Sequence, residues 1–149
     1  MQINTYLFFN GNCAEAFKYY EKVLGGTILA MLTHGEAPAA AHVGPEHQNS
    51  IMHAHLVVEN NALMGSDHCS EMFKQPQGFS VSLHFEDTAE AERVFHALAD
   101  GGTVTMPIEE TFWADRFGMC ADRFGIDWMV NCAKPVQAWM HAEKTAVPA

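Results

Sequence analysis

Residues 111–131 read TFWADRFGMCADRFGIDWMVN and contain the tetrapeptide Asp-Arg-Phe-Gly twice, starting at Asp115 and at Asp122. The second copy lies between two apolar runs. Asp at the first position and Gly at the fourth are favoured in a type I turn, where the Asp side chain accepts hydrogen bonds from backbone N–H groups ahead of it. We therefore predict a closing β-hairpin that turns at the second copy, with Trp113 and Trp128 as large anchors on its strands.

The rest of the chain carries an internal repeat. Two tripeptides of the N-terminal half return in the C-terminal half at offsets that differ by one residue: Ala14-Glu15-Ala16 as Ala89-Glu90-Ala91, and Gly25-Gly26-Thr27 as Gly101-Gly102-Thr103. Self-similarity of this kind indicates a duplicated structural unit. Each copy reads as a strand, a helix and three further strands, so we predict two β-α-β-β-β modules in an α+β fold.

The module boundaries follow from this repeat and from the composition between the two copies. We place the first module at residues 1–67 and the second at residues 79–133, with a linker containing Pro and Gln at residues 68–78. Residues 134–149 form a tail, with one predicted helix from Val136 to Lys144. The whole chain of 149 residues is expected to be a single domain, long enough to bury a sizeable core.

Hydrophobic patterning predicts the individual elements. The segments after Asn12 and Asp87 each show one apolar face at helical spacing, and each predicted N-cap precedes a Glu by three residues, a variant of the capping box. A Gly pair ends both helices, because Gly accepts the left-handed conformation of a C′ position. Residues 34–50 lack periodicity, and a loop of this length is a candidate lid or binding loop. The predicted strands outside the hairpin are 3–9, 27–33, 51–58, 62–66, 79–85 and 103–108.

Charge and composition argue against several classes of partner. A formal net charge of −10, with only eight Lys and Arg, disfavours nucleic acid and anionic membranes, which need clustered basic residues. No apolar run approaches the roughly 18–20 residues of a membrane span, and the N-terminus lacks the features of a signal peptide. We therefore expect a cytoplasmic protein whose Cys residues (Cys13, Cys69, Cys120 and Cys132), which form no C-x-x-C pair, are reduced and largely packed.

Alternation along the strands predicts two kinds of sheet surface. In residues 79–85 it places Phe79, Val81, Leu83 and Phe85 under the helix, and Ser80, Ser82 and His84 on the opposite face. In residues 51–58, His53 and His55 share the face opposite the apolar set. These polar faces either meet water or, where the two sheets curve together, line the cavity of a small-molecule site.

A family resemblance is carried by three segments: Leu7–Ala16, Met64–Asp67 and Thr111–Met129. They are similar to the opening, the end of the fourth strand and the C-terminal signature of the PhnB-like branch of the vicinal oxygen chelate superfamily. That superfamily includes glyoxalase I, extradiol dioxygenases, and bleomycin and fosfomycin resistance proteins. The resemblance runs from about Ile3 to Asn131. It implies paired modules that form a cupped, partly closed mixed sheet, usually in homodimers.

The resemblance also bears on metal binding. Catalytic members of the superfamily place metal ligands, typically His and Glu, at positions that fall near Thr5, Met64, Ser80 and Met129. None of these four is a His or a carboxylate, although a divalent ion needs three or four N, O or S donors. We therefore expect the usual metal site to be absent and expect no cofactor.

Two other sources of chemistry bear on the prediction. A divalent metal could bind at a relocated site through His53, His55 and His84, with His68 as a further candidate, since His53 and His55 share one strand face.

Members of the branch are also often labelled as ubiquinone-related methyltransferases. No Gly-rich loop opens a helix after a strand here, so the sequence does not support a nucleotide-like cofactor.

Three functions stay open at this point. The first, which we favour, is a metal-free protein that binds a small molecule, with an acidic rim of Glu109, Glu110 and Asp115 suited to a cationic ligand. The second is an enzyme, either a lyase, isomerase or dioxygenase with a relocated His-based site or a metal-free acid–base catalyst. The third is a structural homodimer with a filled cavity. The cavity candidates are Thr5, Phe9, His53, His55, Met64, Ser80, Ser82, His84, Trp113, Phe117 and Met129.

Overall fold

The computed structural model describes residues 1–38, 44–68 and 70–145, and it divides into two units, Met1–Pro76 and Gln77–Ala149. The division falls inside the predicted linker. Unit 1 contains β1 (Thr5–Phe9), α1 (Cys13–Leu24), β2 (Thr27–Thr33), a short 3-10 helix η2 (Pro45–His47), β3 (Ile51–Val58) and β4 (Asn61–Asp67). Unit 2 contains β5 (Val81–His84), α2 (Thr88–Ala99), β6 (Thr103–Glu109), β7 (Ala114–Ala121), β8 (Asp127–Ala133) and α3 (Val136–Thr145). None of the described helices is long and apolar enough to cross a membrane.

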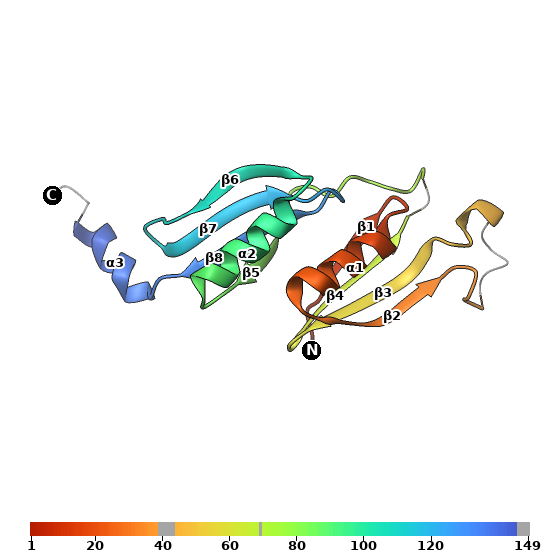
Figure 1. The fold of residues 1–149 in the computed structure, drawn as a ribbon, viewed down its shortest axis with the longest axis horizontal. Helices are drawn as coiled ribbons and strands as arrows, with labels where there is room; N and C mark the ends of the chain where they lie inside the picture. The colour runs from red at the N-terminus through yellow and green to blue at the C-terminus, as the bar shows by residue number, and fades with distance from the viewer. Residues whose placement is uncertain (39–43, 69, 146–149) are drawn as a thin grey trace. The chain divides into compact units, whose positions relative to one another are not determined.

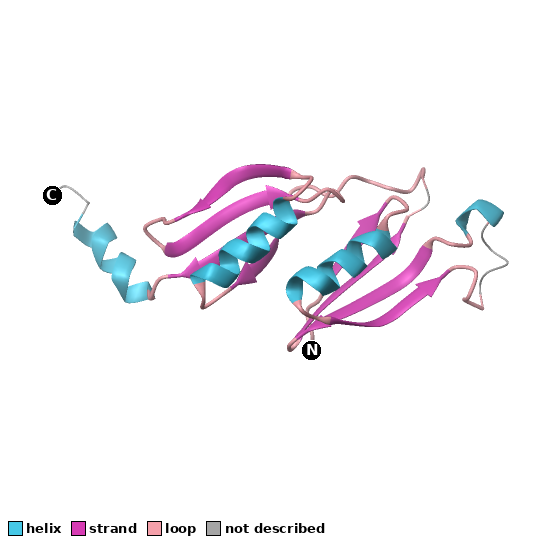
Figure 2. Cartoon of the chain, viewed as in Figure 1, coloured by secondary structure: helices cyan, strands magenta, loops and turns pink. Residues whose placement is uncertain are grey.

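Both modules form a four-stranded mixed sheet with the same topology. The strand orders are β1-β4-β3-β2 and β5-β8-β7-β6. The pairs β1–β4 and β5–β8 are parallel, and the other neighbours are antiparallel. Within each module the helix lies across one face of the sheet (Figures 1 and 2). The predicted α+β fold with two βαβββ modules is confirmed, and the predicted closing of the two sheets into a cup stays a prediction.

The core of each module lies between its helix and its sheet. Phe17 of α1 and Phe95 of α2 are completely or almost completely buried there. Two strand glycines allow the helices to approach this closely. A Cβ atom on Gly65 would lie 2.8 Å from the Phe17 ring, and one on Gly118 would lie 2.7 Å from the Phe95 ring.

The start of α1 differs from the prediction. The Asn12 side chain makes no capping hydrogen bond. Instead, Oδ1 of Asp67 accepts hydrogen bonds from the N–H groups of Gly11 and Cys13, both at 3.0 Å, and Oδ2 accepts from the N–H of Ile51 at 2.8 Å. A carboxylate is a stronger acceptor than a neutral amide, so the predicted capping box of α1 is wrong and Asp67 takes over its role from the end of β4.

Two other predicted helix ends are confirmed. Oδ1 of Asp87 accepts a hydrogen bond from the N–H of Ala89 at 2.9 Å and so caps α2. Gly25 follows α1 with a left-handed φ of 73°, and its N–H donates to the carbonyl of Glu21. The tail helix predicted from Val136 is confirmed as α3.

The first strand of the second module is shorter than predicted. The prediction was residues 79–85, but β5 pairs with β8 only over Val81–His84. Because β8 begins at Asp127, Phe79 lies beyond the end of its partner strand. Phe79 is 49% exposed, so the prediction that it packs under α2 is wrong.

The predicted hairpin is confirmed as β7 and β8, with Trp128 on β8, but the prediction that Trp113 lies on a strand is wrong because β7 begins one residue later. A single carboxylate organises the turn. Gly125 has a positive φ of 90°, and its N–H donates to the carbonyl of Asp122 at 3.1 Å. Oδ1 of Asp122 accepts hydrogen bonds from the N–H groups of Phe124 and Ile126, and Oδ2 accepts from the indole N–H of Trp128 at 2.8 Å. Since Trp128 is only 1% exposed, the turn is bonded directly to the core.

Candidate functional site

Each sheet has one face directed away from its own helix, which we call the helix-free face. In the second module Gly118 is paired with Val130, and a Cβ on Gly118 would touch Phe95 of α2. This pair therefore faces α2, and the positions next to it along each strand face the opposite way. By the strand register, the helix-free face of the second module carries Ser82, His84, Phe117, Met119, Met129 and Asn131.

Three of these side chains form a hydrogen-bonded string. Nδ2 of Asn131 lies 3.2 Å from Nδ1 of His84, and Nε2 of His84 lies 3.1 Å from Oγ of Ser82. If the amide donates to Nδ1, the ring hydrogen sits on Nε2 and is donated to the serine oxygen. The hydroxyl hydrogen of Ser82 is then free to be donated outward. Oδ1 of Asn131 is buried and has no hydrogen-bond partner among the described residues.

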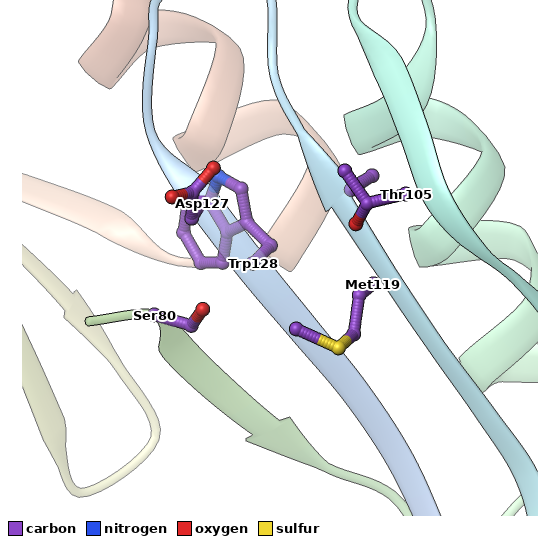
Figure 3. A pocket seen from close by; sticks show the side chains of 6 residues that line it. Ser80, Thr105, Met119, Asp127 and Trp128 are labelled. Carbon is purple, nitrogen blue, oxygen red and sulfur yellow. The ribbon is translucent and has the colours of Figure 1, made fainter. Parts of the chain in front are cut away.

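A pocket of about 220 Å³ opens at the end of the second module where β8 begins (Figure 3). Its lining residues are Ser80, Thr105, Met119, Cys120, Asp127 and Trp128. Ser80, Asp127 and Trp128 lie across the pocket from Thr105 and Met119 (Figure 3). The pairing of β6 with β7 shifts register between Val104 and Met106, and Thr105 lies at this shift. Such irregularities change the direction in which a side chain points. The pocket thus combines one carboxylate and two hydroxyls with a thioether, whereas the side chains of Cys120 and Trp128 share the face of Gly118 and Val130, which is covered by α2.

Two predicted aromatic residues lie together at the opposite end of β7. The rings of Trp113 and Phe117 are 5.3 Å apart and meet edge to face. Trp113 is half-buried, and Phe117 is 7% exposed. Neither residue lines the pocket, so the structure separates them from Ser80.

The helix-free face of the first module carries an aromatic and imidazole cluster. Oη of Tyr6 lies 3.2 Å from Nδ1 of His53. His55 is paired with Met64, and Met64 is also paired with Tyr6, which places all three on this face. The structure therefore brings the predicted residues His53, His55 and Met64 together. Beside them, the rings of Phe8 and His68 are in contact in a tilted arrangement, with centroids 4.0 Å apart.

Two predicted cavity residues of β1 point the other way. Phe9 is buried in the core, where its ring lies 6.0 Å from that of Phe17. Thr5 shares the face of Phe9 by alternation. These two residues therefore lie on the helix side, and Tyr6 and Phe8 occupy the helix-free face instead. Residues 5–9 read TYLFF, and a strand with apolar or aromatic residues on both faces gives no alternation from which to choose.

The described residues include no group of three or more His, Cys, Asp or Glu side chains placed to hold a metal ion. The rings of His53 and His55 are 6.3 Å apart. The four positions that the family resemblance relates to metal ligands are Thr5 and Met64 on the first module and Ser80 and Met129 on the second. Neutral hydroxyls and thioethers do not form the donor set that a divalent ion requires.

The described cysteines are packed thiols. Cys13, Cys120 and Cys132 are buried and unbridged. Burial raises the pKa of Cys120 to about 11, and the carboxylates of Asp122 and Asp127 add to this rise. Burial likewise raises the pKa of the other two thiols. Because the thiolate is the nucleophile, the prediction that Cys120 and Cys132 are core residues is confirmed.

The acidic rim proposed from the sequence is partly neutralised. Nζ of Lys134 lies 3.0 Å from a carboxylate oxygen of Glu110. Glu109 is exposed and Asp115 half-buried, and neither of them lines the pocket. The carboxylate that does line it is Asp127, which sequence reasoning missed. Asp127 follows the hairpin turn by two residues, and only the strand register shows that it shares the face of Met129.

Known proteins resemble the chain over nearly its whole length. Protein YjdN of Escherichia coli is 34% identical over 90% of this chain and 97% of its own. The crystal structure of protein PA1353 from Pseudomonas aeruginosa is 50% identical, covers 91% of this chain and 99% of its own, and superimposes with a TM-score of 0.81. The fosfomycin resistance protein FosX of Listeria monocytogenes, at 6% identity and a TM-score of 0.64, shares the fold alone.

A PhnB protein from Bacillus cereus, described as a putative 3-demethylubiquinone-9 3-methyltransferase, is 25% identical with a TM-score of 0.76 and covers 89% of this chain and all of its own. The family model described as 3-demethylubiquinone-9 3-methyltransferase matches residues 1–131. The name of the family model mentions a methyltransferase activity. A match to the model does not by itself assign that reaction to this chain. The match covers both βαβββ modules, and the chain therefore belongs to this PhnB-like family of the glyoxalase, bleomycin resistance and dioxygenase fold.

Proposed function

We propose that the protein binds a small organic molecule on the helix-free face of its second module, without a metal ion. The observation that carries this proposal is the pocket of about 220 Å³ at the start of β8. Ligand sites are typically concave and apolar with a few polar groups that fix orientation. Met119 supplies apolar surface, and Ser80, Thr105 and Asp127 supply the polar groups.

The string formed by Ser82, His84 and Asn131 extends the polar surface of the same face. Ser82 and His84 are exposed, so their hydrogen-bonding groups are accessible within the module. The two hydrogen bonds already fix the ring of His84. A ligand that binds to this ring therefore causes a smaller loss of side-chain conformational entropy than a ligand that binds to a freely rotating ring. The face therefore offers a fixed donor and acceptor next to the apolar side chains of Met119 and Met129.

Binding can be tested by NMR on the isotope-labelled full chain with a library of small metabolites. A ligand of this site shifts the amide signals of Ser80, Met119 and Asp127 in a saturable way. The S80W variant, which places a large ring at the pocket wall, should abolish these shifts while the spectrum stays that of a folded protein. A matched substitution of the exposed Phe79, F79W, should leave them unchanged. Failure of every compound to shift the helix-free face would refute the proposal.

A second candidate is a metal-free acid–base enzyme, and the observation that favours it is the same hydrogen-bonded string. Asn131 orients the ring of His84, and Ser82 lies 3.1 Å from the other ring nitrogen. A positioned imidazole is the most frequent general acid or base. If a bound compound is turned over, H84Q should remove turnover while binding persists. Turnover that survives H84Q would exclude this role.

Self-association into a homodimer stays a prediction from the family resemblance. Light scattering on the purified chain would test it, with a dimer expected near twice the chain mass of 16.5 kDa.

A further inference from the structure

The electrostatic character of the pocket narrows the class of ligand. Its lining residues include one carboxylate, that of Asp127, and no Lys or Arg. Among the described side chains, none donates a hydrogen bond to this carboxylate and none forms an ion pair with it. A half-buried carboxylate without a protein partner leaves its acceptor sites available to a bound molecule.

None of the Lys and Arg side chains that the structure describes in the second module lines the pocket. Arg93 pairs with Glu90, Arg116 with Glu92 and Lys134 with Glu110, and the guanidinium of Arg123 lies 5.0 Å from the ring of Phe124. The formal charge of the whole chain is −10, which adds a general attraction for cations.

The negative charge of Asp127 reaches the pocket wall. Cys120 is a lining residue whose thiol pKa is raised mainly by burial, and the carboxylates of Asp122 and Asp127 add to this rise. The negative charge that disfavours a thiolate at Cys120 would attract a cation bound in the pocket. The hydroxyls of Ser80 and Thr105 on the same wall can accept hydrogen bonds as well as donate them.

We infer that the ligand bound in this pocket is a small primary ammonium compound. This inference rests on the proposed binding function. An ammonium group has three N–H donors. The pocket presents three matching acceptors: the Asp127 carboxylate, Oγ of Ser80 and Oγ1 of Thr105. The apolar part of the ligand packs on the thioether of Met119. At roughly 30 Å³ per water-sized unit, the pocket of about 220 Å³ accommodates a compound of about seven non-hydrogen atoms.

The test compares two probes of one shape and different charge, benzylamine and benzyl alcohol, by NMR titration of the full chain at pH 7. Benzylammonium is expected to shift the amides of Ser80, Thr105 and Asp127 with a Kd at least about tenfold below that of the alcohol. D127N should raise the benzylammonium Kd at least about tenfold, because it removes a charge-assisted hydrogen bond. D127N keeps the size of the side chain, and its spectrum reports whether it is folded.

Two controls separate the pocket from the general field of an acidic protein. D100N removes one exposed carboxylate of the same module outside the pocket, and it should leave the Kd unchanged. The double variant S80A/T105V keeps the charge and removes two acceptors, and it should weaken benzylammonium several-fold. Equal affinity for alcohol and ammonium, an unchanged Kd in D127N, or equal losses in D100N and D127N would each overturn the inference.

The two proposals fail in different ways. If the alcohol binds the pocket as tightly as the ammonium compound, the binding function stands and the ligand class is wrong. If neither probe shifts the pocket amides at millimolar concentration, the ligand class is again overturned, while the metabolite screen decides the binding function by itself.

Discussion

Replacing Asp122 should destabilise the protein strongly, although the residue lies in a turn. Its side chain is 5% exposed and accepts three hydrogen bonds, from the N–H groups of Phe124 at 2.9 Å and Ile126 at 3.0 Å and from the indole of Trp128 at 2.8 Å. A hydrogen bond to a charged group contributes about 1.5–3 kcal/mol, and an orphaned buried donor costs about 1–3 kcal/mol. The two backbone N–H groups of a turn can partly regain water, whereas the indole of Trp128 cannot.

These terms give different values for two substitutions. D122A leaves all three donors without the carboxylate, and we expect a loss of about 3–5 kcal/mol in the free energy of unfolding. D122N keeps an oxygen for the two backbone donors but turns an amide NH₂ toward the indole N–H, and we expect a loss of about 2 kcal/mol. Equilibrium unfolding in urea, followed by circular dichroism and extrapolated to water, measures both.

The matched control is D115N, which changes the first residue of the other Asp-Arg-Phe-Gly copy. The carboxylate of Asp115 accepts no hydrogen bond from a described residue, so the free energy of unfolding should change by less than about 0.5 kcal/mol. If D122N and D115N have equal effects, or if D122A costs less than about 1 kcal/mol, the assignment of the turn carboxylate to the core is refuted.

Three further predictions concern other parts of the fold. D67A should lower the free energy of unfolding by about 3 kcal/mol because three buried or half-buried N–H groups lose their acceptor, whereas N12A should change it by less than about 0.5 kcal/mol. A cost of about 1 kcal/mol for N12A would instead support the capping box. G118A should cost about 1–3 kcal/mol by overpacking, since its Cβ would lie 2.7 Å from Phe95; calorimetry that shows an unchanged Tm would contradict this. Folding raises the pKa of Cys120 from 9.0 to about 11, so the unfolded thiol ionises first. The stabilisation from the neutral thiol is therefore complete below pH 9 and is lost between pH 9 and pH 11. Urea midpoints across this range should fall less steeply in C120A than in the unmodified chain.

The two copies of Asp-Arg-Phe-Gly show that local sequence alone does not determine secondary structure in this chain. Asp122–Gly125 forms the predicted turn, but Asp115–Gly118 is part of β7. In the first copy, Gly118 faces α2 and makes room for Phe95. The two copies have the same four residues but different structures. The second copy lies between two pairing strands and forms their turn, whereas the first copy is part of a strand that packs against a helix. Tertiary packing overrides turn preference in the first copy.

The residues of the helix-free faces were predicted only in part. Alternation in residues 79–85 and 51–58 identified Ser82, His84, His53 and His55, since polar and apolar residues alternate there. It could not orient β1, where both faces are apolar or aromatic, and so Thr5 and Phe9 were chosen in place of Tyr6 and Phe8. Asp127 was missed because a single carboxylate after a turn has no local signal of function.

The sequence by itself determined the duplicated βαβββ modules, the positions of both helices and the closing hairpin. These depend on periodicity, Gly pairs and turn residues, which act over a few positions along the chain. The tertiary structure decided which acceptor caps α1, which face of β1 is free of the helix, and which side chains meet in the pocket at the start of β8. Those outcomes depend on register between strands distant in sequence, where a shift of one residue moves every side chain to the other face.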